Sequence, residues 1–237
     1  MIAIRLRPLL VILAAVCYPQ ESQAMGKDDP LLTMVMIDKL EFGLTDESIP
    51  QRLEMQAWAG YDLSKLWLKS DVEREGGNTD SADVEVLYGR AISPYWDVRV
   101  GWKHDFEPTP SRDWAAIGIY GLAPYFFEVD STAYINSSGQ VSLDLSVEYE
   151  VLFTQRLILS PEIEAVINGS DDSDTGSGSG VSSIEAGLRL RYEIRREFAP
   201  YIGVHWERSY GNTADFDRVK GEDIDDFYVV VGIRAWF

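Results

Sequence analysis

The chain has 237 residues, a formal net charge of −18, 46% hydrophobic residues and 12% aromatic residues. The acidic excess argues against a nucleic-acid-binding protein, because phosphates attract lysine and arginine. The hydrophobic content is too high for a disordered chain. The length suits one large all-β domain or two small domains.

The first 24 residues predict a secretory signal peptide. Two arginines precede an apolar run at residues 9–16, and small residues near the end of the stretch suit cleavage before Met25. The apolar run is too short to cross a bilayer as a helix. A lipoprotein site at Cys17 is disfavoured, because Val16 stands where a small residue is expected. Cys17 is the only cysteine, and cleavage before Met25 would remove it, so the mature chain is expected to form no disulfide.

Side-chain alternation is the dominant pattern after the signal peptide, and turn residues interrupt it. It is clearest at residues 141–151, where Val, Leu and Tyr alternate with Ser, Asp and Glu. We expect strands of about ten residues at 34–44, 51–61, 65–74, 82–91, 95–106, 112–122, 125–135, 141–151, 156–168, 181–194, 199–210 and 224–237.

The first expected strand has one irregularity. Met34 and Met36 share an apolar row with Leu40 and Phe42, but Asp38 breaks this row. Because a strand points successive side chains to opposite faces, Asp38 predicts either a bulge or a face that looks into protein.

The last expected strand is apolar on one row, mixed on the other, and ends in Phe237. It resembles the closing strand of a bacterial outer-membrane β-barrel. An even number of strands, with short turns alternating with longer polar loops, is typical of such barrels. The sequence therefore predicts an all-β fold: a transmembrane antiparallel up-and-down β-barrel of twelve strands. We expect a signal peptide at 1–24, a short periplasmic N-terminal segment at 25–33 and the barrel at 34–237.

Two polar connections stand out, at residues 169–180 and 211–223. The first is rich in Gly, Ser and Asp, lacks the lysine of a phosphate-binding loop, and is interpreted as a flexible surface loop. Its aspartates lack the spacing and distal glutamate of a calcium loop.

The run from Gly187 to Gly203 resembles a conserved stretch of the copper resistance protein B family, the outer-membrane components of bacterial copper-resistance operons. Shorter similar blocks occur in family order at residues 37–41, 60–63, 66–70, 93–97, 103–105, 121–125, 155–159, 211–214 and 234–237. The resemblance covers about residues 35–237.

This resemblance implies a bacterial outer-membrane protein that helps periplasmic copper leave, or be held, under copper stress. We expect it to confer copper resistance by binding periplasmic copper ions and passing them outward through an acidic lumen. Copper would be transported or bound, without a catalytic role. The implied partners are copper ions, outer-membrane lipid and a periplasmic copper-binding protein or oxidase. Many members carry a Met- or His-rich segment before the barrel, and residues 25–32 are short by comparison.

The candidate copper ligands are few. Thioethers suit Cu(I), and imidazole suits both oxidation states. We consider Met34, Met36, His104, Asp105, His205 and Glu207 as metal-binding candidates. His205 and Glu207 fall on an inward row, whereas His104 falls on an outward row and Asp105 then points inward. Met34 and Met36 reach the lumen only if the first strand is bulged or unpaired there.

Carboxylates are the larger expected feature of the interior. The inward rows carry Glu128, Asp130, Asp144, Glu148, Glu150, Glu162, Glu164, Glu185 and Glu193. Arg99, Lys103, Arg189 and Arg191 are available to pair with some of them. We expect a paired plug near Arg189 and Arg191, with further acidic sites that attract cations.

Two other functions remain open at this point. A structural or plugged barrel without transport fits the same strands. An outer-membrane phospholipase would need a serine beside His104, and the outward rows next to it are expected to offer Tyr88, Trp114, Ala116 and Gly118. We therefore expect no enzymatic activity.

Overall fold

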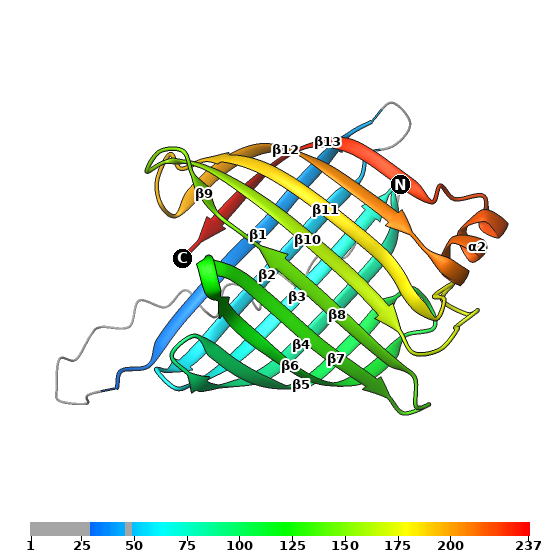
Figure 1. Cartoon of the computed structure of the whole chain (residues 1–237), viewed down its shortest axis with the longest axis horizontal. Helices are drawn as coiled ribbons and strands as arrows, with labels where there is room; N and C mark the ends of the chain where they lie inside the picture. Colours follow the sequence, from blue (N-terminus) through cyan, green and yellow to red (C-terminus); the bar gives the residue numbers. More distant parts are fainter. Residues whose placement is uncertain (1–28, 46–48) are drawn as a thin grey trace, which may run out of the picture. The chain divides into compact units, whose positions relative to one another are not determined.

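The computed structural model describes residues 29–45 and 49–237, and residues 31–237 form the unit that contains the sheet. The predicted signal peptide lies outside the described residues. Alternating sequence forms antiparallel strands in chain order (Figure 1). The strands are β1 (Leu32–Leu44), β2 (Gln51–Tyr61), β3 (Ser64–Glu75), β4 (Asn78–Ser93), β5 (Trp96–Glu107), β6 (Arg112–Ala123), β7 (Phe127–Asn136), β8 (Val141–Glu148), β9 (Val151–Leu152), β10 (Leu157–Asn168), β11 (Gly180–Tyr192), β12 (Phe198–Ser209) and β13 (Asp225–Trp236).

The sheet closes on itself, because β13 pairs with β1. β8 and β9 both pair with β10 and are separated by two residues, so they form one interrupted strand of the wall. The described residues thus form a closed barrel of twelve strands, and the predicted fold is confirmed. Within residues 29–45 and 49–237, no helix is long and apolar enough to cross a membrane.

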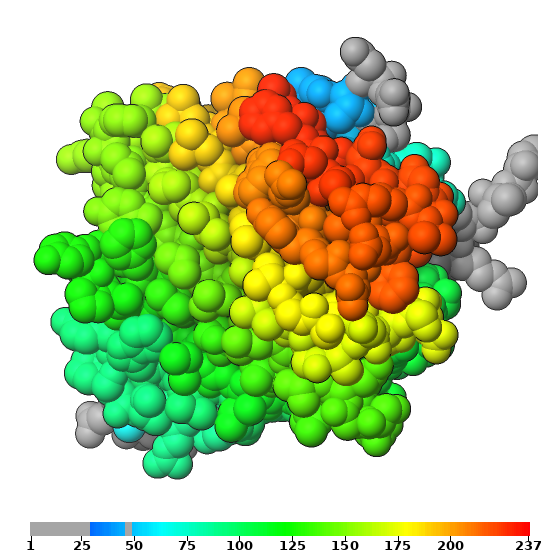
Figure 2. All heavy atoms as spheres, turned by 45° about the vertical axis from the view of Figure 1, so that its right-hand side comes forward, coloured from blue at the N-terminus to red at the C-terminus, as the bar shows by residue number. Residues whose placement is uncertain are grey.

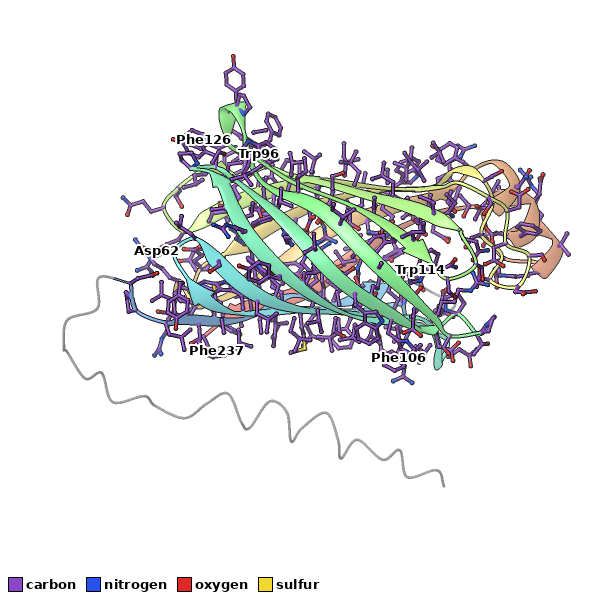
Figure 3. The ribbon with its side chains drawn as sticks, turned by 90° about the horizontal axis from the view of Figure 1, so that it is seen from below. Asp62, Trp96, Phe106, Trp114, Phe126 and Phe237 are labelled. Carbon is purple, nitrogen blue, oxygen red and sulfur yellow. The ribbon has the colours of Figure 1, made fainter. Side chains whose placement is uncertain are left out.

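Short turns and both ends of the barrel chain lie at one end, which we call the periplasmic end by the loop-length rule for such barrels. One of these turns is the 3₁₀ segment η1 (Pro124–Phe126). Figure 3 shows Trp96 and Phe126 at this end, and Phe106 and Trp114 at the opposite, outer end.

The outer end differs from expectation in two connections. β3 and β4 meet in a tight turn at Gly76 and Gly77, both with positive φ, where a longer loop was predicted. The predicted loop at 211–223 contains helix α2 (Gly211–Lys220). Gly221 ends this helix with φ 83°, and its N–H bonds to the carbonyl of Arg218. A left-handed glycine is a common helix terminator.

The outer wall is apolar. The paired residues Tyr88, Val100 and Ile117 lie side by side on β4, β5 and β6, and each is more than 40% exposed. Side chains paired across strands project from the same face, so these form part of a lipid-facing band. The alternate row of β5 holds Arg99, which is 1% exposed.

A bulge at Asp38 changes which face the first strand presents. The register of β1 shifts between Ile37 and Lys39 against β2, and between Ile37 and Leu40 against β13. The predicted bulge is confirmed. Because one extra residue reverses the alternation, the residues before it change face.

The outward row assigned to Met34 and Met36 is therefore wrong. Met34 pairs with Trp58, whose ring packs against the buried ring of Trp67 inside the barrel. Met36 Sδ lies 3.9 Å from Nη2 of Arg234. Both methionines belong to the inner face.

The expected rows of β6 are also wrong. Trp114 Nε1 donates to Oδ2 of Asp105 at 2.6 Å, and Ala116 is buried against Tyr134 inside the barrel. Gly118 shares this inward row. The outward residue paired with His104 is Asp113.

Candidate functional site

The barrel interior contains three adjoining cavities. The periplasmic cavity has a volume of about 640 Å³, the central cavity about 360 Å³ and the outer cavity about 260 Å³. Tyr120 and Glu128 line both the periplasmic and the central cavity. Lys103, Tyr134 and Asp144 line both the central and the outer cavity. The cavities therefore follow one another from one end of the barrel to the other.

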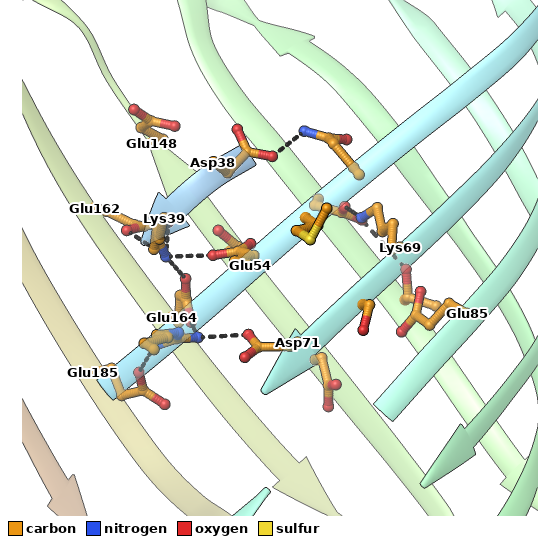
Figure 4. Close-up of a pocket in the computed structure, with 18 of the residues that line it drawn as sticks. Asp38, Lys39, Glu54, Lys69, Asp71, Glu85, Glu148, Glu162, Glu164 and Glu185 are labelled. Atoms are coloured by element: carbon orange, nitrogen blue, oxygen red, sulfur yellow. Dashed lines mark hydrogen bonds and ion pairs between the residues drawn. The ribbon is translucent and has the colours of Figure 1, made fainter. Parts of the chain in front are cut away.

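Acidic side chains dominate the central cavity. Among the described residues, its lining has thirteen carboxyl groups and seven basic groups. Figure 4 shows many of these side chains pointing toward one another from opposite walls. Because the carboxyl groups outnumber the basic groups, the interior is negative and favours cations.

Lys39 projects from β1 into the lumen, where carboxylates of β2 and β10 surround it. Its Nζ lies 3.0 Å from Glu54, 2.9 Å from Glu162 and 2.9 Å from Glu164 (Figure 4). The Lys39 side chain is 8% exposed. A buried ammonium needs such partners, because removal from water is costly.

Arg52 continues the same network. Its guanidinium contacts Glu185 at 2.8 Å and both Asp71 and Glu164 at 3.2 Å. These carboxylates come from three different strands. The guanidinium fork presents several donors in fixed directions, which suits contact with several carboxylates at once.

Three further arginines complete the paired region. Arg189 bonds to Glu41 and, at 2.6 Å, to Glu162. Arg191 bonds to Glu150. The predicted pairing of both arginines with lumen carboxylates is confirmed. Arg234 adds a 3.4 Å ion pair with Asp38.

The opposite wall is aromatic. Trp67, Leu87, Ala116 and Tyr134 form its buried cluster. The guanidinium of Arg99 lies 3.9 Å from the ring centroid of Tyr120 and 5.1 Å from that of Trp67. Its ion pair with Asp130 is 3.3 Å long. Cation–π contact compensates part of the cost of burying this charge.

The two boundaries between cavities are polar. At the periplasmic boundary, the Tyr120 hydroxyl donates to Glu128 at 2.5 Å. At the outer boundary, the Tyr134 hydroxyl donates to Glu85 at 2.6 Å, and Lys103 Nζ lies 5.0 Å from the Tyr134 ring centroid.

The predicted metal-binding residues do not form one site. Met34 and Met36 lie on the part of β1 nearest the periplasmic end. His205 is buried inside the wall, with Nε2 4.0 Å from Glu185 and 3.9 Å from Glu207. Asp105 lines the outer cavity. In the part of the chain that the structure describes, no group of three or more His, Cys, Asp and Glu residues is arranged to hold a metal ion.

His104 lies on the outer face, as its row predicted. Its Nδ1 is 2.8 Å from Asp113, its ring stacks on Trp102, and Phe106 meets it edge-on. His104 and Asp105 thus point to opposite faces of the wall. Because His104 points outward, it does not contribute to a metal site in the lumen.

Several basic residues of the lumen were not predicted from the sequence. Lys39 and Arg52 stand on the rows opposite the apolar rows of the first two strands, and this alternation was the available signal. Their partners were not accessible from sequence, because Lys39 and Glu162 are separated by 123 positions.

The loop between β10 and β11 lies at the outer end and lines the outer cavity. Asp172 is buried, pairs with Arg112 and accepts a hydrogen bond from Gln140 at 3.1 Å. The loop also contacts α2: the Gly178 N–H donates to Thr213 Oγ1 at 2.8 Å. Figure 2 shows α2 lying against this segment. The segment predicted as a flexible surface loop thus contacts α2 and neighbouring strands.

Comparison with known proteins identifies the family. Residues 31–237 match the sequence profile of the copper resistance protein B precursor family, CopB. The chain belongs to the copper resistance protein B family. Copper resistance protein B of Escherichia coli is 42% identical over 210 residues, which cover 89% of this chain and 71% of that protein. The copper resistance protein B homolog of Pseudomonas syringae pv. tomato is 41% identical over 223 residues, covering 94% and 76%.

The fold of this copper resistance protein B member resembles solved porins. The NanC porin has a TM-score of 0.55 and 13% identity, covering 86% of this chain and 99% of that chain. The KdgM porin has a TM-score of 0.50 and 12% identity, covering 87% and 99%. At these identities the likeness concerns the fold alone. The porin-like barrel and the family place the protein in the bacterial outer membrane.

Proposed function

We propose that the barrel confers copper resistance by giving periplasmic copper ions a route outward through its lumen. The observation that carries this proposal is the row of three cavities, whose central member is lined by more carboxyl groups than basic groups. A negative, hydrated interior attracts cations. Carboxylates bind copper less selectively than sulfur does, which suits transit better than storage.

Met34 and Met36 are proposed to receive copper at the periplasmic end. The bulge at Asp38 turns them inward, and thioethers are good ligands for Cu(I). His205 and Glu207 are proposed to act separately, farther along the lumen. A periplasmic copper-binding protein or oxidase is the proposed donor. Ions in such a barrel move down their gradient, so outward flow requires more free copper in the periplasm than outside.

A plugged structural barrel is the second candidate. It is favoured by the tight pairing of Lys39, Arg52 and Arg189, which fills one side of the lumen. Copper transit requires that ions pass along the acidic side of the lumen, which is lined by Asp83, Glu85 and Asp144. The two candidates therefore differ in whether ions cross.

We propose no catalytic role for the barrel. His104 is held by Asp113, Trp102 and Phe106 on the outer face, and a serine hydrolase would need a nucleophile within hydrogen-bond reach of the imidazole. If the purified barrel hydrolyses phospholipid and the His104→Ala variant does not, a non-catalytic role is contradicted.

The cellular test compares a deletion strain, the complemented strain and two variants under copper stress. Deletion is expected to lower growth and raise periplasmic copper, measured by mass spectrometry after osmotic shock. Glu128→Gln keeps an acceptor for Tyr120 but removes a charge at the periplasmic boundary, and should partly reproduce the defect. Glu222→Gln removes an exposed charge beside α2 and is the matched control.

The vesicle test decides between route and plug. Purified barrel is placed in vesicles that contain a fluorescent copper chelator, and copper is added outside. Quenching that depends on the barrel supports a route. Quenching equal to that of empty vesicles favours the plug. In the cellular test, a deletion strain whose periplasmic copper is unchanged or lowered would contradict outward passage.

A further inference from the structure

Lys103 occupies the boundary between the central and outer cavities, together with Tyr134 and Asp144. It projects from β5, and the boundary residues Tyr134 and Asp144 come from β7 and β8. An ion that moves between the two cavities must therefore pass this ammonium group.

The carboxylates around Lys103 hold it loosely. Its Nζ is 3.7 Å from Asp105, 3.9 Å from Asp83 and 4.0 Å from Asp144. All three distances exceed the length of a hydrogen bond. Glu85 is nearby but accepts its hydrogen bond from Tyr134.

Two other lumen lysines, Lys39 and Lys69, are held by shorter contacts. Lys39 has three carboxylate contacts at 2.9–3.0 Å, and Lys69 is 2.7 Å from Asp130. Coulomb attraction decreases with distance, and a lysine side chain has a flexible four-carbon stem. Lys103 can thus move aside at a lower cost than Lys39 or Lys69.

We propose that Lys103 is the selectivity residue of the lumen: a tethered cation that occupies the passage and is displaced by a passing divalent cation. This inference rests on the proposed function and applies to copper that passes as Cu(II). In the resting barrel the ammonium neutralises part of the charge of Asp83, Asp105 and Asp144. A divalent ion carries more charge than the ammonium, so it competes better for the same carboxylates than a monovalent ion does.

The experiment measures ion selectivity in planar bilayers and copper uptake in vesicles. Lys103→Met removes the charge while keeping an unbranched side chain, and Lys103→Arg keeps the charge. Lys69→Met is the matched control: it changes the net charge equally, but Arg99 still faces Asp130 at 3.3 Å.

We expect Lys103→Met to raise the cation-to-anion permeability ratio on the order of fivefold, and to reduce the preference for divalent over monovalent cations. Lys103→Arg should resemble the wild type, and Lys69→Met should change selectivity less. Equal selectivity in Lys103→Met and Lys69→Met would overturn the inference. Folding is checked by the heat-dependent shift in gel mobility, and Lys103→Met/Asp144→Asn restores the charge balance if the single variant does not fold.

The results also separate this inference from the proposed function. A wild-type barrel that conducts copper, with Lys103→Met identical to it, refutes the role of Lys103 alone. A wild-type barrel that conducts other divalent cations but no copper, with a weaker preference for divalent cations in Lys103→Met, supports the role of Lys103 and contradicts copper passage. A wild-type barrel that conducts no cation, with Lys103→Met conducting, shows that Lys103 blocks the passage without being displaced, which contradicts both. If neither conducts, both are wrong.

Discussion

Met36 Sδ lies 3.9 Å from Arg234 Nη2, inside the barrel where the first and last strands meet. The contact exists because the bulge at Asp38 turns the periplasmic part of β1 around. Asp38 itself pairs with Arg234 at 3.4 Å. One extra residue therefore places a thioether and a carboxylate beside the same guanidinium at the closing seam.

Replacement of Met36 by leucine tests whether this thioether takes part in copper binding. Met36→Leu conserves volume, so the barrel should fold normally while Cu(I) binding weakens, measured by competition with a Cu(I) chelator. Met55→Leu is the comparison, because Met55 also borders the central cavity but alternates with Glu54 and Gln56 along β2. Equal Cu(I) affinity in the two variants would exclude Met36 as a ligand.

Lys39→Met should strongly destabilise the barrel. Removal of one partner from a buried ion pair leaves uncompensated charge and typically costs about 3–5 kcal/mol. Three carboxylates lose their common cation here: Glu54, Glu162 and Glu164. Urea unfolding in lipid vesicles, followed by tryptophan fluorescence, measures the change.

The control for Lys39 is Lys220→Met on α2. Lys220 is half-exposed and lies 3.7 Å from Glu222, and exposed ion pairs contribute about 0–1 kcal/mol. Lys39→Met/Glu164→Gln should recover part of the loss. Equal stability of Lys39→Met and Lys220→Met would show that the lumen network does not support the fold.

Acid should loosen the contact between the outer loop and α2. Hydrogen bonds from the Asn212 side chain and the Ser179 N–H lower the pKa of Asp171 below its ordinary value. A carboxyl group with a lowered pKa stabilises the fold above its unfolded pKa, and this contribution is lost as the pH falls through the folded value.

A spin label at Ser173→Cys reports this change, since the described chain contains no native cysteine. Loop mobility should increase as the pH falls below about 4. Asp171→Asn should be mobile already at neutral pH and should respond less to acid. A wild-type loop whose mobility stays constant from pH 7 down to the acid limit of the folded barrel would contradict the role of Asp171.

The periplasmic turn at Tyr125 and Phe126 should tolerate an Asn-Gly replacement. Both residues have positive φ, 68° and 67°, a region in which side chains other than glycine cost about 1–3 kcal/mol. Asn-Gly favours this turn geometry. We expect Tyr125→Asn/Phe126→Gly to raise unfolding stability in detergent by about 1–2 kcal/mol.

The gain should be smaller in a bilayer, because the two exposed aromatic side chains, 82% and 75% accessible, suit contact with the lipid interface. Ser138→Gly is the control, because Ser138 lies in a turn but does not have a positive φ, and this change should not stabilise the barrel. Equal gains in detergent and bilayer would argue against lipid contact by Tyr125 and Phe126.

Local sequence patterns were sufficient to predict the barrel and its strand number. Alternation requires only local information, since neighbouring side chains point to opposite faces, and the strand ranges follow to within a few residues. The same pattern located the bulge, because Asp38 breaks an apolar row. His205 and Glu207 were correctly placed on an inward row for the same reason.

The tertiary structure decides which side chains face the lumen and which charged side chains pair. The face of Met34 and Met36 depends on the register that the bulge takes against β2 and β13, and the row of Trp114 depends on its pairing with Lys103. Lys39 meets Glu162 because the barrel closes, across 123 positions of sequence. Closure also creates the boundary at Lys103. Such partners are set by strand order and shear around the whole barrel, which no local pattern contains.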